Sequence, residues 1–325
     1  MINRRDFLKT TGMASAGVLS LSALALALGG QDESTSGPTS MPTATPLLKI
    51  SLAQWSLHNA LYGGELTNLD FPVVTKRDFG IDAVEYVNSF MREESRKDTY
   101  VQELKKVCRE EGVQSVLIMC DGEGRLGDPD KVARSLAVTN HHRWIEIAKE
   151  LGCHSIRVNA ASEGDWDTQR DLAADGLSQL TEYGAKAKIN VIVENHGGLS
   201  SNGAWLSEVM RKVHQPMCGT LPDFGNFFVG GDAGPKRDGW YDIYRGVKEL
   251  MPFAKAVSAK SHNFDESGNE TAKDYMRILR IVLDAGYRGR LGIEYEGGER
   301  PEPEGIQLTK ALIERCITAL TPEYT

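Results

Sequence analysis

The sequence predicts an α/β protein built as one eight-stranded (β/α)8 barrel, and three observations lead to this prediction. Eight short apolar runs follow one another between residues 48 and 295 at fairly regular spacing, and amphipathic segments separate them. Glycine stands where several of those segments end, and glycine is the preferred residue at the C-terminal end of a helix. Strands that alternate with helices form a parallel sheet with right-handed crossovers, and eight such units close into a barrel.

The eight apolar runs predict the strands in chain order. Each has the length and composition of a buried strand. They are Leu48–Trp55, Ile81–Val87, Val113–Cys120, Ser155–Asn159, Ile189–Glu194, Cys218–Asp223, Lys255–Lys260 and Leu291–Tyr295.

The helices between them are predicted from their amphipathic pattern. The clearest are Thr99–Glu111, Val132–Leu151, Leu172–Lys188, Trp205–Val213, Tyr275–Ala285 and Gly305–Leu320, and the glycines that end helices are Gly80, Gly112, Gly152 and Gly286. His141 and His142 fall in Val132–Leu151, and we expect them on its solvated face. An open doubly wound sheet is the alternative, but no Gly-x-Gly-x-x-Gly follows the first strand.

The composition excludes several classes of protein. The chain has 325 residues, is 25% charged and carries a formal net charge of −8. An acidic balance argues against nucleic acid as a partner, because phosphates require a basic surface. The five scattered cysteines are odd in number and contain no Cys-x-x-Cys pair, so we expect neither a disulfide framework nor a zinc ribbon.

Residues 1–30 predict an export signal that is separate from the fold. Arg4-Arg5 precedes Phe7-Leu8, and an apolar stretch broken by serine and glycine runs to Leu28. This segment resembles a twin-arginine signal, which implies the twin-arginine export machinery as a partner and a periplasmic or otherwise exported location. Ala25-Leu26-Ala27 offers a cleavage site, and an uncleaved membrane tether is the alternative. A basic N-terminal helix without an export role is the competing interpretation.

Residues 31–46 predict a flexible linker. They consist mainly of Ser, Thr, Pro and Gly, with almost no large apolar side chain to bury. The barrel domain is therefore predicted over residues 47–325.

Polar and charged residues stand at the carboxyl ends of the predicted strands, where barrel enzymes carry their catalytic groups. From the first strand to the eighth they include His58, Glu85, Asp121, Arg157 and Asn159, Glu194 and His196, Asp223 and Asn226, Lys260 and His262, and Glu294 and Glu296. Charged side chains are rarely buried unless they are paired or bind a metal. Together these residues predict a site at one end of the barrel.

Glu194, Asp223 and Glu294 are the strongest candidates for metal ligands. Carboxylates directed at one space repel each other unless a cation or a shared proton lies between them. A divalent cation satisfies them, and Mn²⁺, Mg²⁺, Co²⁺ and Zn²⁺ are the candidates. Structural ion pairs with Arg157 and Lys260 are the competing interpretation.

These strand ends resemble those of the xylose-isomerase-like TIM barrels, the sugar phosphate isomerase/epimerase superfamily. The resemblance covers roughly residues 48–320, and it is carried by the segments SLAQWSLH (51–58), VENHGG (193–198), LPDFGN (221–226) and GIEYEG (292–297). It implies a divalent metal and a small sugar or sugar derivative as substrate. Such barrels often form dimers or tetramers, so a homo-oligomer is compatible with it.

In ketose epimerases of this superfamily, a Glu, an Asp, a His and a Glu from strands five to eight bind the metal, and the two glutamates act as acid and base. The resemblance assigns these roles to Glu194, Asp223 and Glu294, but Ser258 stands where the ligand histidine is expected. His262 lies four residues further on the same face and is our candidate for the missing ligand; a rim histidine that contacts water or substrate is the alternative. Asn226 replaces a substrate-holding histidine.

We therefore predict a proton transfer next to the metal-bound carbonyl of a keto-sugar, with Glu194 and Glu294 as acid and base. Lys260 is predicted to face the developing oxyanion, and a salt bridge is its alternative role. The predicted substrate contacts are His58, Glu85, Arg157, Asn159, His196 and Asn226. A lyase, dehydratase or hydrolase acting on glycosides, including 3-keto-glycosides, and a sugar-binding barrel without turnover are the alternative functions.

Overall fold

The computed structural model describes residues 46–230 and 239–325. The predicted export signal (1–30) and nearly all of the predicted linker (31–46) lie outside these residues. Within them, no helix has both the length and the apolar character needed to span a membrane.

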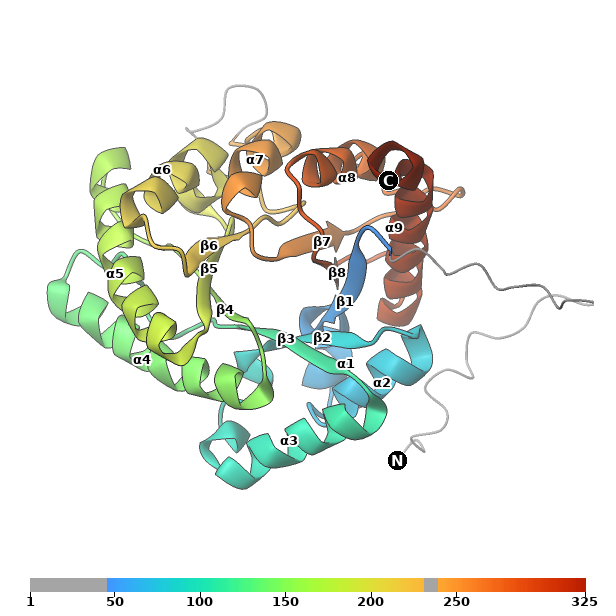
Figure 1. Cartoon of the computed structure of the whole chain (residues 1–325), viewed down its shortest axis with the longest axis horizontal. Helices are drawn as coiled ribbons and strands as arrows, with labels where there is room; N and C mark the ends of the chain where they lie inside the picture. The colour runs from blue at the N-terminus through green and yellow to red at the C-terminus, as the bar shows by residue number, and fades with distance from the viewer. Residues whose placement is uncertain (1–45, 231–238) are drawn as a thin grey trace, which may run out of the picture. The chain divides into compact units, whose positions relative to one another are not determined.

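Eight parallel strands form the inner layer of the protein and confirm the predicted (β/α)8 barrel (Figure 1). They are β1 (Lys49–Ala53), β2 (Ala83–Val87), β3 (Gln114–Met119), β4 (Ser155–Val158), β5 (Asn190–Glu194), β6 (Cys218–Leu221), β7 (Val257–Ser261) and β8 (Arg290–Tyr295). With the exception of β6 and β7, strands that follow each other in the sequence are neighbours in the sheet, and β1 also pairs with β8, as when Ser51 lies opposite Gly292. Each predicted strand is present at the predicted place.

The barrel closes between β6 and β7 through isolated bridges. Thr220 pairs with Ala254, and Asp223, just beyond β6, pairs with Ser258. The amide of Ser258 donates to the carbonyl of Pro222 at 3.0 Å, and the carbonyl of Ser258 accepts from Phe224 at 3.1 Å. This seam brings Asp223 and Ser258 side by side, although 35 residues separate them.

Helices surround the strands as an outer ring (Figure 1). They are α1 (His58–Tyr62), α2 (Asp70–Phe79), α3 (Asp98–Glu111), α4 (Lys131–Leu151), α5 (Trp166–Ala187), α6 (Gly203–Val213), α7 (Ile243–Leu250), α8 (Tyr275–Asp284) and α9 (Glu302–Tyr324). Short 3-10 turns lie in the connections: η2 (Gln54–Leu57), η3 (Asn88–Phe90), η4 (Glu94–Arg96), η5 (Gly198–Ser201) and η6 (Met251–Phe253). The six predicted helices are confirmed, and Gly80 and Gly152 cap α2 and α4 with φ of 65° and 78°.

The strands are buried on both faces, as expected for a parallel sheet between two layers of side chains. Inside the barrel, Ala53, Leu117, Met119 and Ile192 belong to one apolar cluster and are fully buried. The apolar faces of the helices pack on the outside of the strands. This packing leaves the carboxyl ends of the strands and their loops free to carry polar groups.

The expectation for His141 is wrong. Its side chain is 2% exposed and its Nδ1 lies 2.7 Å from the carbonyl of Ala137, one turn earlier in α4. His142 remains half-buried and stacks on Tyr183 with ring centroids 3.7 Å apart. A histidine on a helix can face the core of the protein when a backbone carbonyl accepts its N–H. The next residue then points to a different side of the helix.

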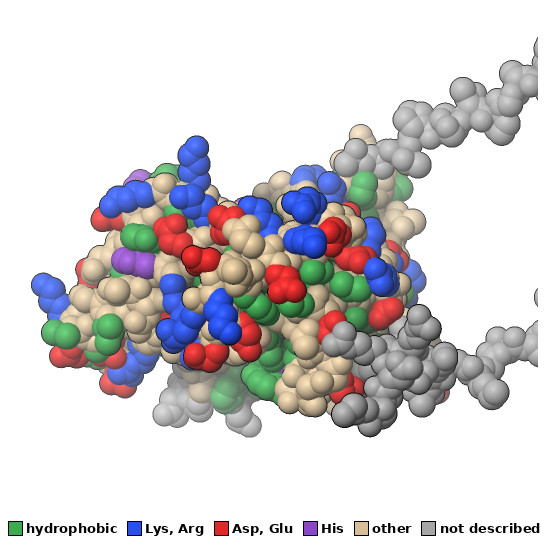
Figure 2. Space-filling model, turned by 90° about the horizontal axis from the view of Figure 1, so that it is seen from below, with side chains coloured by type: hydrophobic (Ala, Val, Ile, Leu, Met, Phe, Trp, Pro, Cys, Tyr) green, Lys and Arg blue, Asp and Glu red, His purple; other side chains and the backbone are tan. Residues whose placement is uncertain are grey.

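Acidic and basic side chains are interspersed on the face seen in Figure 2. All five cysteines lie in the described residues, and none of them forms a disulfide there.

Candidate active site

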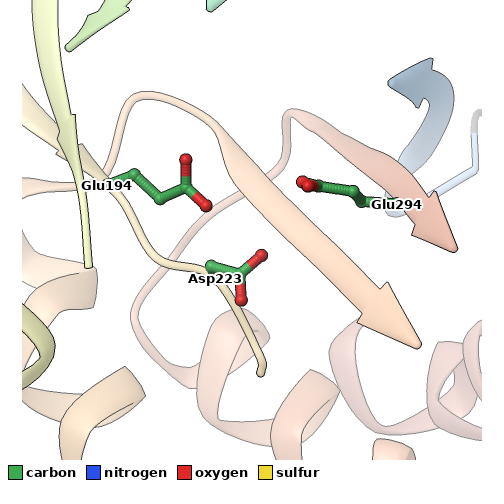
Figure 3. Close-up of side chains that lie close together, drawn as sticks. All are labelled: Glu194, Asp223 and Glu294. Atoms are coloured by element: carbon green, nitrogen blue, oxygen red, sulfur yellow. The ribbon is translucent and has the colours of Figure 1, made fainter. Parts of the chain in front are cut away.

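Three buried carboxylates converge at the carboxyl ends of β5, β6 and β8. Glu194 ends β5, Asp223 follows β6, and Glu294 is the fifth residue of β8. One oxygen of each lies within 4.8 Å of one oxygen of each of the others, and all three side chains are buried. Figure 3 shows Glu194 and Glu294 reaching from opposite sides toward the space beside Asp223.

Asp223 is held by the turn that follows β6. Its Oδ1 accepts from the amides of Gly225 at 2.7 Å and Asn226 at 2.8 Å. Asn195 fixes the same turn, because its Oδ1 accepts from the amide of Asp223 at 2.7 Å and its Nδ2 donates to the carbonyl of Asp223 at 3.0 Å. The Asp223 carboxylate is therefore positioned before any ligand arrives.

Ser258 links two of the carboxylates. Its hydroxyl oxygen lies 2.5 Å from Asp223 Oδ2 and 3.0 Å from Glu294 Oε2, and its side chain is fully buried. A hydroxyl donates only one hydrogen, so it can satisfy only one of these two oxygens at a time. The other contact requires a proton on a carboxyl group or a cation nearby.

Two buried cations flank the carboxylates. Arg157 Nη1 donates to Asp121 Oδ1 at 2.7 Å, and Arg157 Nε lies 2.8 Å from Glu194 Oε2 without the angle of a hydrogen bond. Lys260 Nζ lies 3.2 Å from Glu294 and 3.1 Å from Glu296. The positive charges are thus shared among several carboxylates.

The ion-pair interpretation covers only part of this site. Glu194 pairs with Arg157 and Glu294 with Lys260, but the nearest cation to Asp223 is Lys260 Nζ, at 4.0 Å. Asp121 and Glu296 compete for the same two cations, so the carboxylates outnumber them. Without a further cation, some of these carboxyl groups must therefore hold a proton.

The excess of carboxylates over cations affects the pKa values of the groups in the site. Burial raises the pKa of Glu194 to about 8; Arg157 opposes the rise, and Glu294 and Asp223 add to it. Burial also raises the pKa of Glu294, against the influence of Lys260. Burial alone would lower the pKa of Lys260, but the surrounding carboxylates outweigh it and hold that pKa well above its usual range.

The donor atoms fit a divalent metal. Glu194 Oε2 is buried and has no hydrogen-bond partner among the described residues, which is unusual for a carboxylate oxygen. The ligand atoms that converge here are carboxylate oxygens, with the Ser258 hydroxyl beside them. Oxygen donors of this kind suit hard divalent cations.

His262 lies at the edge of the site and outside the convergent set. Its Nδ1 lies 3.2 Å from Lys273 Nζ and its Nε2 lies 3.9 Å from Glu296, while 41% of its side chain is exposed. It is not among the side chains whose ligand atoms lie within 4.8 Å of one another. This position corresponds to the rim histidine of the sequence analysis.

Of the predicted substrate contacts, Arg157 and Asn226 lie against Glu194, because Asn226 Nδ2 donates to Glu194 Oε1 at 2.9 Å. Asn159 Nδ2 donates to Asp121 Oδ1 at 2.7 Å, so it reaches the site through Asp121. His196 is the second residue after β5 and is exposed. These four side chains surround the β4–β6 side of the carboxylates.

Glu85 lies at a different depth in the barrel from Glu194, Asp223 and Glu294. Its Oε1 accepts from the Ser51 hydroxyl at 2.6 Å, and its other oxygen lies so close to Gly292 that a β-carbon there would be 2.5 Å away. It also lines a cavity of about 170 Å³ with Gln114 and Arg290, which begin β3 and β8. Glu85 is thus directed toward the amino-terminal end of the barrel, away from the mouth.

His58 stands on the other side of the mouth. Its Nδ1 lies 2.8 Å from the carbonyl of Trp55 and 3.4 Å from Glu302, and its ring stacks on Trp55 with centroids 5.0 Å apart. Burial raises the pKa of Glu296, but Lys260 and, to a smaller extent, Trp55 outweigh it and hold that pKa below its usual range. His58 therefore packs against Trp55 at the edge of the mouth.

The roles of Asn195 and Ser258 were not predicted from the sequence. Asn195 lies between two predicted site residues, but alternation along a strand directs it away from their face. Its function depends on the turn after β6, which is distant in the sequence. Ser258 was noted only as a replaced histidine, and its contact with two carboxylates depends on the closure of the barrel between β6 and β7.

The fold and the site define a (β/α)8 barrel with a carboxylate centre at the carboxyl ends of its strands. A family model described as "Xylose isomerase-like TIM barrel" matches residues 76–316. The chain belongs to this family.

Solved structures share the fold at low sequence identity. An L-ribulose 3-epimerase has a TM-score of 0.64 at 14% identity, with 85% of this chain and 96% of that chain covered. A xylose isomerase-like protein from Mycobacterium smegmatis in complex with magnesium gives 0.62 at 16% identity, covering 86% and 98%. The 3-keto-D-glucoside 4-epimerase from E. coli gives 0.59 at 17% identity, covering 83% and 100%.

One curated relative is similar over a short segment. The C-glycoside deglycosidase alpha subunit from Arthrobacter globiformis is 40% identical over 75 residues, which is 21% of this chain and 21% of the relative. The match thus spans about a fifth of the length of that relative.

Proposed function

We propose that the protein is a metal-dependent isomerase or epimerase that moves a proton next to the carbonyl of a keto-sugar. The observation that carries this proposal is the convergence of Glu194, Asp223 and Glu294 within 4.8 Å, buried at the carboxyl ends of three strands. The excess of carboxylates over cations supports a bound cation, as does Glu194 Oε2, which accepts no hydrogen bond among the described residues although Arg157 Nε lies 2.8 Å away. Two relatives in the fold are named as sugar epimerases, which supports the reaction class.

Glu194, Asp223 and Glu294 would hold the metal, with the Ser258 hydroxyl as an additional oxygen donor. Of the four candidate cations, this all-oxygen set favours Mg²⁺ or Mn²⁺ over Co²⁺ or Zn²⁺, which bind nitrogen and sulfur ligands well. The similar barrel from Mycobacterium smegmatis is named as a complex with magnesium. When bound, such a cation polarises the substrate carbonyl and makes the neighbouring C–H more acidic.

Glu194 and Glu294 are suited to exchange a proton with the substrate. They reach the same space from opposite sides of the barrel (Figure 3), so one carboxylate can accept the proton at one face of a carbon atom and the other can return a proton at the opposite face. In the metal-free protein, burial raises the pKa of both carboxyl groups, so each can hold a proton more readily than an exposed carboxylate.

Lys260 and Arg157 stabilise negative charge in this scheme. The ammonium of Lys260 is 2% exposed and lies between Glu294 and Glu296, so it can face an oxygen that gains charge during the reaction. Arg157 orients Glu194 and Asp121 and can bind a substrate hydroxyl. Asn226 holds the other Glu194 oxygen and His196 borders the mouth, so we propose both as substrate contacts.

A lyase acting on a glycoside is the second candidate. The same proton abstraction next to a carbonyl can be followed by loss of a substituent on the next carbon, which cleaves the bond to the aglycone. The similarity of one segment to a C-glycoside deglycosidase alpha subunit favours this alternative. Both candidates share the first step, and the fate of the substituent distinguishes them.

We also propose that the chain is exported through the twin-arginine route. Arg4-Arg5 and the apolar stretch after it support this proposal. Replacing both arginines with lysine should retain the protein in the cytoplasm, and fractionation of cells measures this. Unchanged recovery in the periplasmic or membrane fraction would contradict it.

The experiment that tests the reaction is solvent deuterium exchange. The full chain is incubated with Mg²⁺ or Mn²⁺ in D₂O with a panel of keto-sugars and 3-keto-glucosides, and mass spectrometry and NMR follow the C–H next to the carbonyl. We expect incorporation of deuterium by the wild type and a loss of at least roughly 100-fold in Glu194→Gln and Glu294→Gln. NMR of the products separates epimerisation from cleavage.

Glu299→Gln is the matched control, because Glu299 is an exposed glutamate in the loop after β8. It should exchange deuterium at the wild-type rate. Metal-loaded wild-type protein that exchanges no deuterium into any compound of the panel would refute the proposed reaction, as would full exchange by the two glutamine variants.

A further inference from the structure

A second cavity opens beside the carboxylate site. It has a volume of about 240 Å³, and its side-chain lining comes from His196, Ser201, Asn226, Phe228 and Trp240. Asn226 belongs to both places, because its Nδ2 donates to Glu194 Oε1 at 2.9 Å. A molecule bound at Glu194 therefore lies next to this cavity.

Two exposed aromatic rings form one wall of the cavity. Phe228 is 46% exposed and Trp240 is 42% exposed, and their ring centroids lie 5.5 Å apart. Large apolar side chains with this exposure are few among the described residues: the others are Tyr62, Val132 and Leu136. Two of the five lie together at one cavity, and grouped exposed apolar side chains mark binding sites more often than scattered ones.

The backbone holds the two rings in place. Phe228 and Trp240 form an antiparallel bridge, and the hydrogen bonds lie at the flanking residues: Val229 N donates to the Gly239 carbonyl at 2.7 Å, and Tyr241 N donates to the Phe227 carbonyl at 2.8 Å. In such a non-hydrogen-bonded pair the two side chains project to the same side at close range.

This bridge is anchored in the body of the protein. Phe227 is fully buried and packs against Gly246 of α7, where a β-carbon would lie only 2.1 Å from its ring. Tyr241 is also buried and donates to Glu249 Oε2 at 2.7 Å. The neighbouring residues are thus packed inside, while Phe228 and Trp240 are exposed.

Two polar side chains of the cavity, those of Ser201 and Asn226, are already engaged within the protein, whereas His196 is exposed. The Ser201 hydroxyl donates to the Asn226 carbonyl at 2.7 Å and accepts from the amide of Gly197 at 2.8 Å. The side chain of Asn226 donates to Glu194 and accepts from Lys260 Nζ at 3.4 Å. Apart from His196, a second sugar here would find few side-chain partners for its hydroxyl groups, whereas a flat apolar ring needs none.

We propose that this cavity binds a flat apolar substituent, such as an aryl aglycone, attached to the sugar that occupies the carboxylate site. The inference rests on the proposed function for the position of the sugar and narrows its substrate class from free keto-sugars to aryl glycosides. The rings of Phe228 and Trp240 contact the substituent, and Asn226 marks the boundary between sugar and substituent.

The test compares the binding of three sugars that contain no ketone group and cannot undergo the proposed proton transfer. Isothermal titration calorimetry with the full chain and Mg²⁺ measures phenyl β-D-glucoside, methyl β-D-glucoside and cellobiose. We expect the phenyl glucoside to bind about tenfold more tightly than either of the others. In Phe228→Ala and Trp240→Ala, the ratio of the affinity for the phenyl glucoside to that for the methyl glucoside should fall toward one. Trp240→Phe should keep most of the wild-type ratio.

Leu136→Ala is the control, because Leu136 is an exposed apolar residue on α4, outside this cavity. It should show the wild-type preference. The proposal is overturned if the wild type binds phenyl and methyl glucoside equally or binds neither, if cellobiose binds as tightly as the phenyl glucoside, or if both alanine variants keep the preference.

The two proposals fail in different ways. Loss of deuterium exchange with an intact phenyl preference overturns the proposed reaction and leaves the aryl subsite standing. Deuterium exchange without a phenyl preference overturns the aryl subsite alone.

Discussion

Replacement of Glu85 by glutamine should change how the stability of the barrel depends on pH. Glu85 is 1% exposed, and one of its oxygens has no hydrogen-bond partner among the described residues. Burial raises its pKa from 4.5 to about 7; the Ser51 hydroxyl opposes the rise, Glu294 adds to it, and Arg290 and Arg157 oppose it. Glutamine keeps the shape of the side chain and cannot ionise.

The sign of the effect follows from the raised pKa. The folded protein holds the Glu85 proton more tightly than the unfolded chain, so the stabilisation is complete below pH 4.5 and is lost as the pH rises to about 7. The difference between these two pKa values corresponds to a loss of about 3 kcal/mol in the free energy of unfolding. Most of that loss falls between pH 5 and pH 8.

Urea unfolding of the full chain at pH 5 and pH 8, followed by circular dichroism, measures this loss. We expect Glu85→Gln to lose about 2 to 3 kcal/mol less than the wild type between the two pH values. Glu103→Gln on α3 removes an exposed carboxylate and is the control, with a wild-type dependence. Equal losses in Glu85→Gln and the wild type would refute the reasoning. An unchanged KM in Glu85→Gln would also favour a barrel-filling role over substrate contact.

Three further changes test how the site is held together. Asn195→Ala loosens the turn that positions Asp223, so the affinity for Mn²⁺ should fall roughly 10- to 100-fold in calorimetry, and an unchanged affinity would contradict this role. Ser258→His adds a nitrogen donor and should shift the preference from Mn²⁺ toward Zn²⁺ in competition titrations, whereas an unaltered ratio would argue against Ser258 as a neighbour of the metal. Arg157→Met leaves Glu194 buried without its counter-charge and should destabilise the metal-free protein by about 3 to 5 kcal/mol, measured by urea unfolding; a loss below about 1 kcal/mol would show that Glu194 does not depend on the pair.

The fold was predictable because it repeats a local pattern. An apolar run such as Val113–Cys120 has the length and composition of a strand. A glycine such as Gly112 ends the preceding helix with a φ of 65°. The sequence analysis did not single out α7, because this helix of eight residues follows a glycine-rich segment and is too short for a clear period. His141 was misplaced because a buried histidine depends on a carbonyl partner that composition does not reveal.

The site was predictable where a residue ends a strand, and less so where its role depends on packing between strands. Glu194, Asp223 and Glu294 follow from the rule that parallel strands present their carboxyl ends on one side. The level of Glu85 within the barrel depends on the stagger between β1, β2 and β8, which no local pattern encodes. The contacts of Ser258 depend on closure of the sheet, and the outward turn of His262 depends on its contacts with Lys273.

Metal binding by the full chain tests the central claim most directly. Calorimetric titration of metal-free protein with Mn²⁺ should show one ion per chain for the wild type and for Glu299→Gln, and at least roughly 100-fold weaker binding for Glu194→Gln. A wild type that binds no Mn²⁺ or Mg²⁺, or a Glu194→Gln variant that binds as tightly as the wild type, would contradict a shared cation among these three carboxylates.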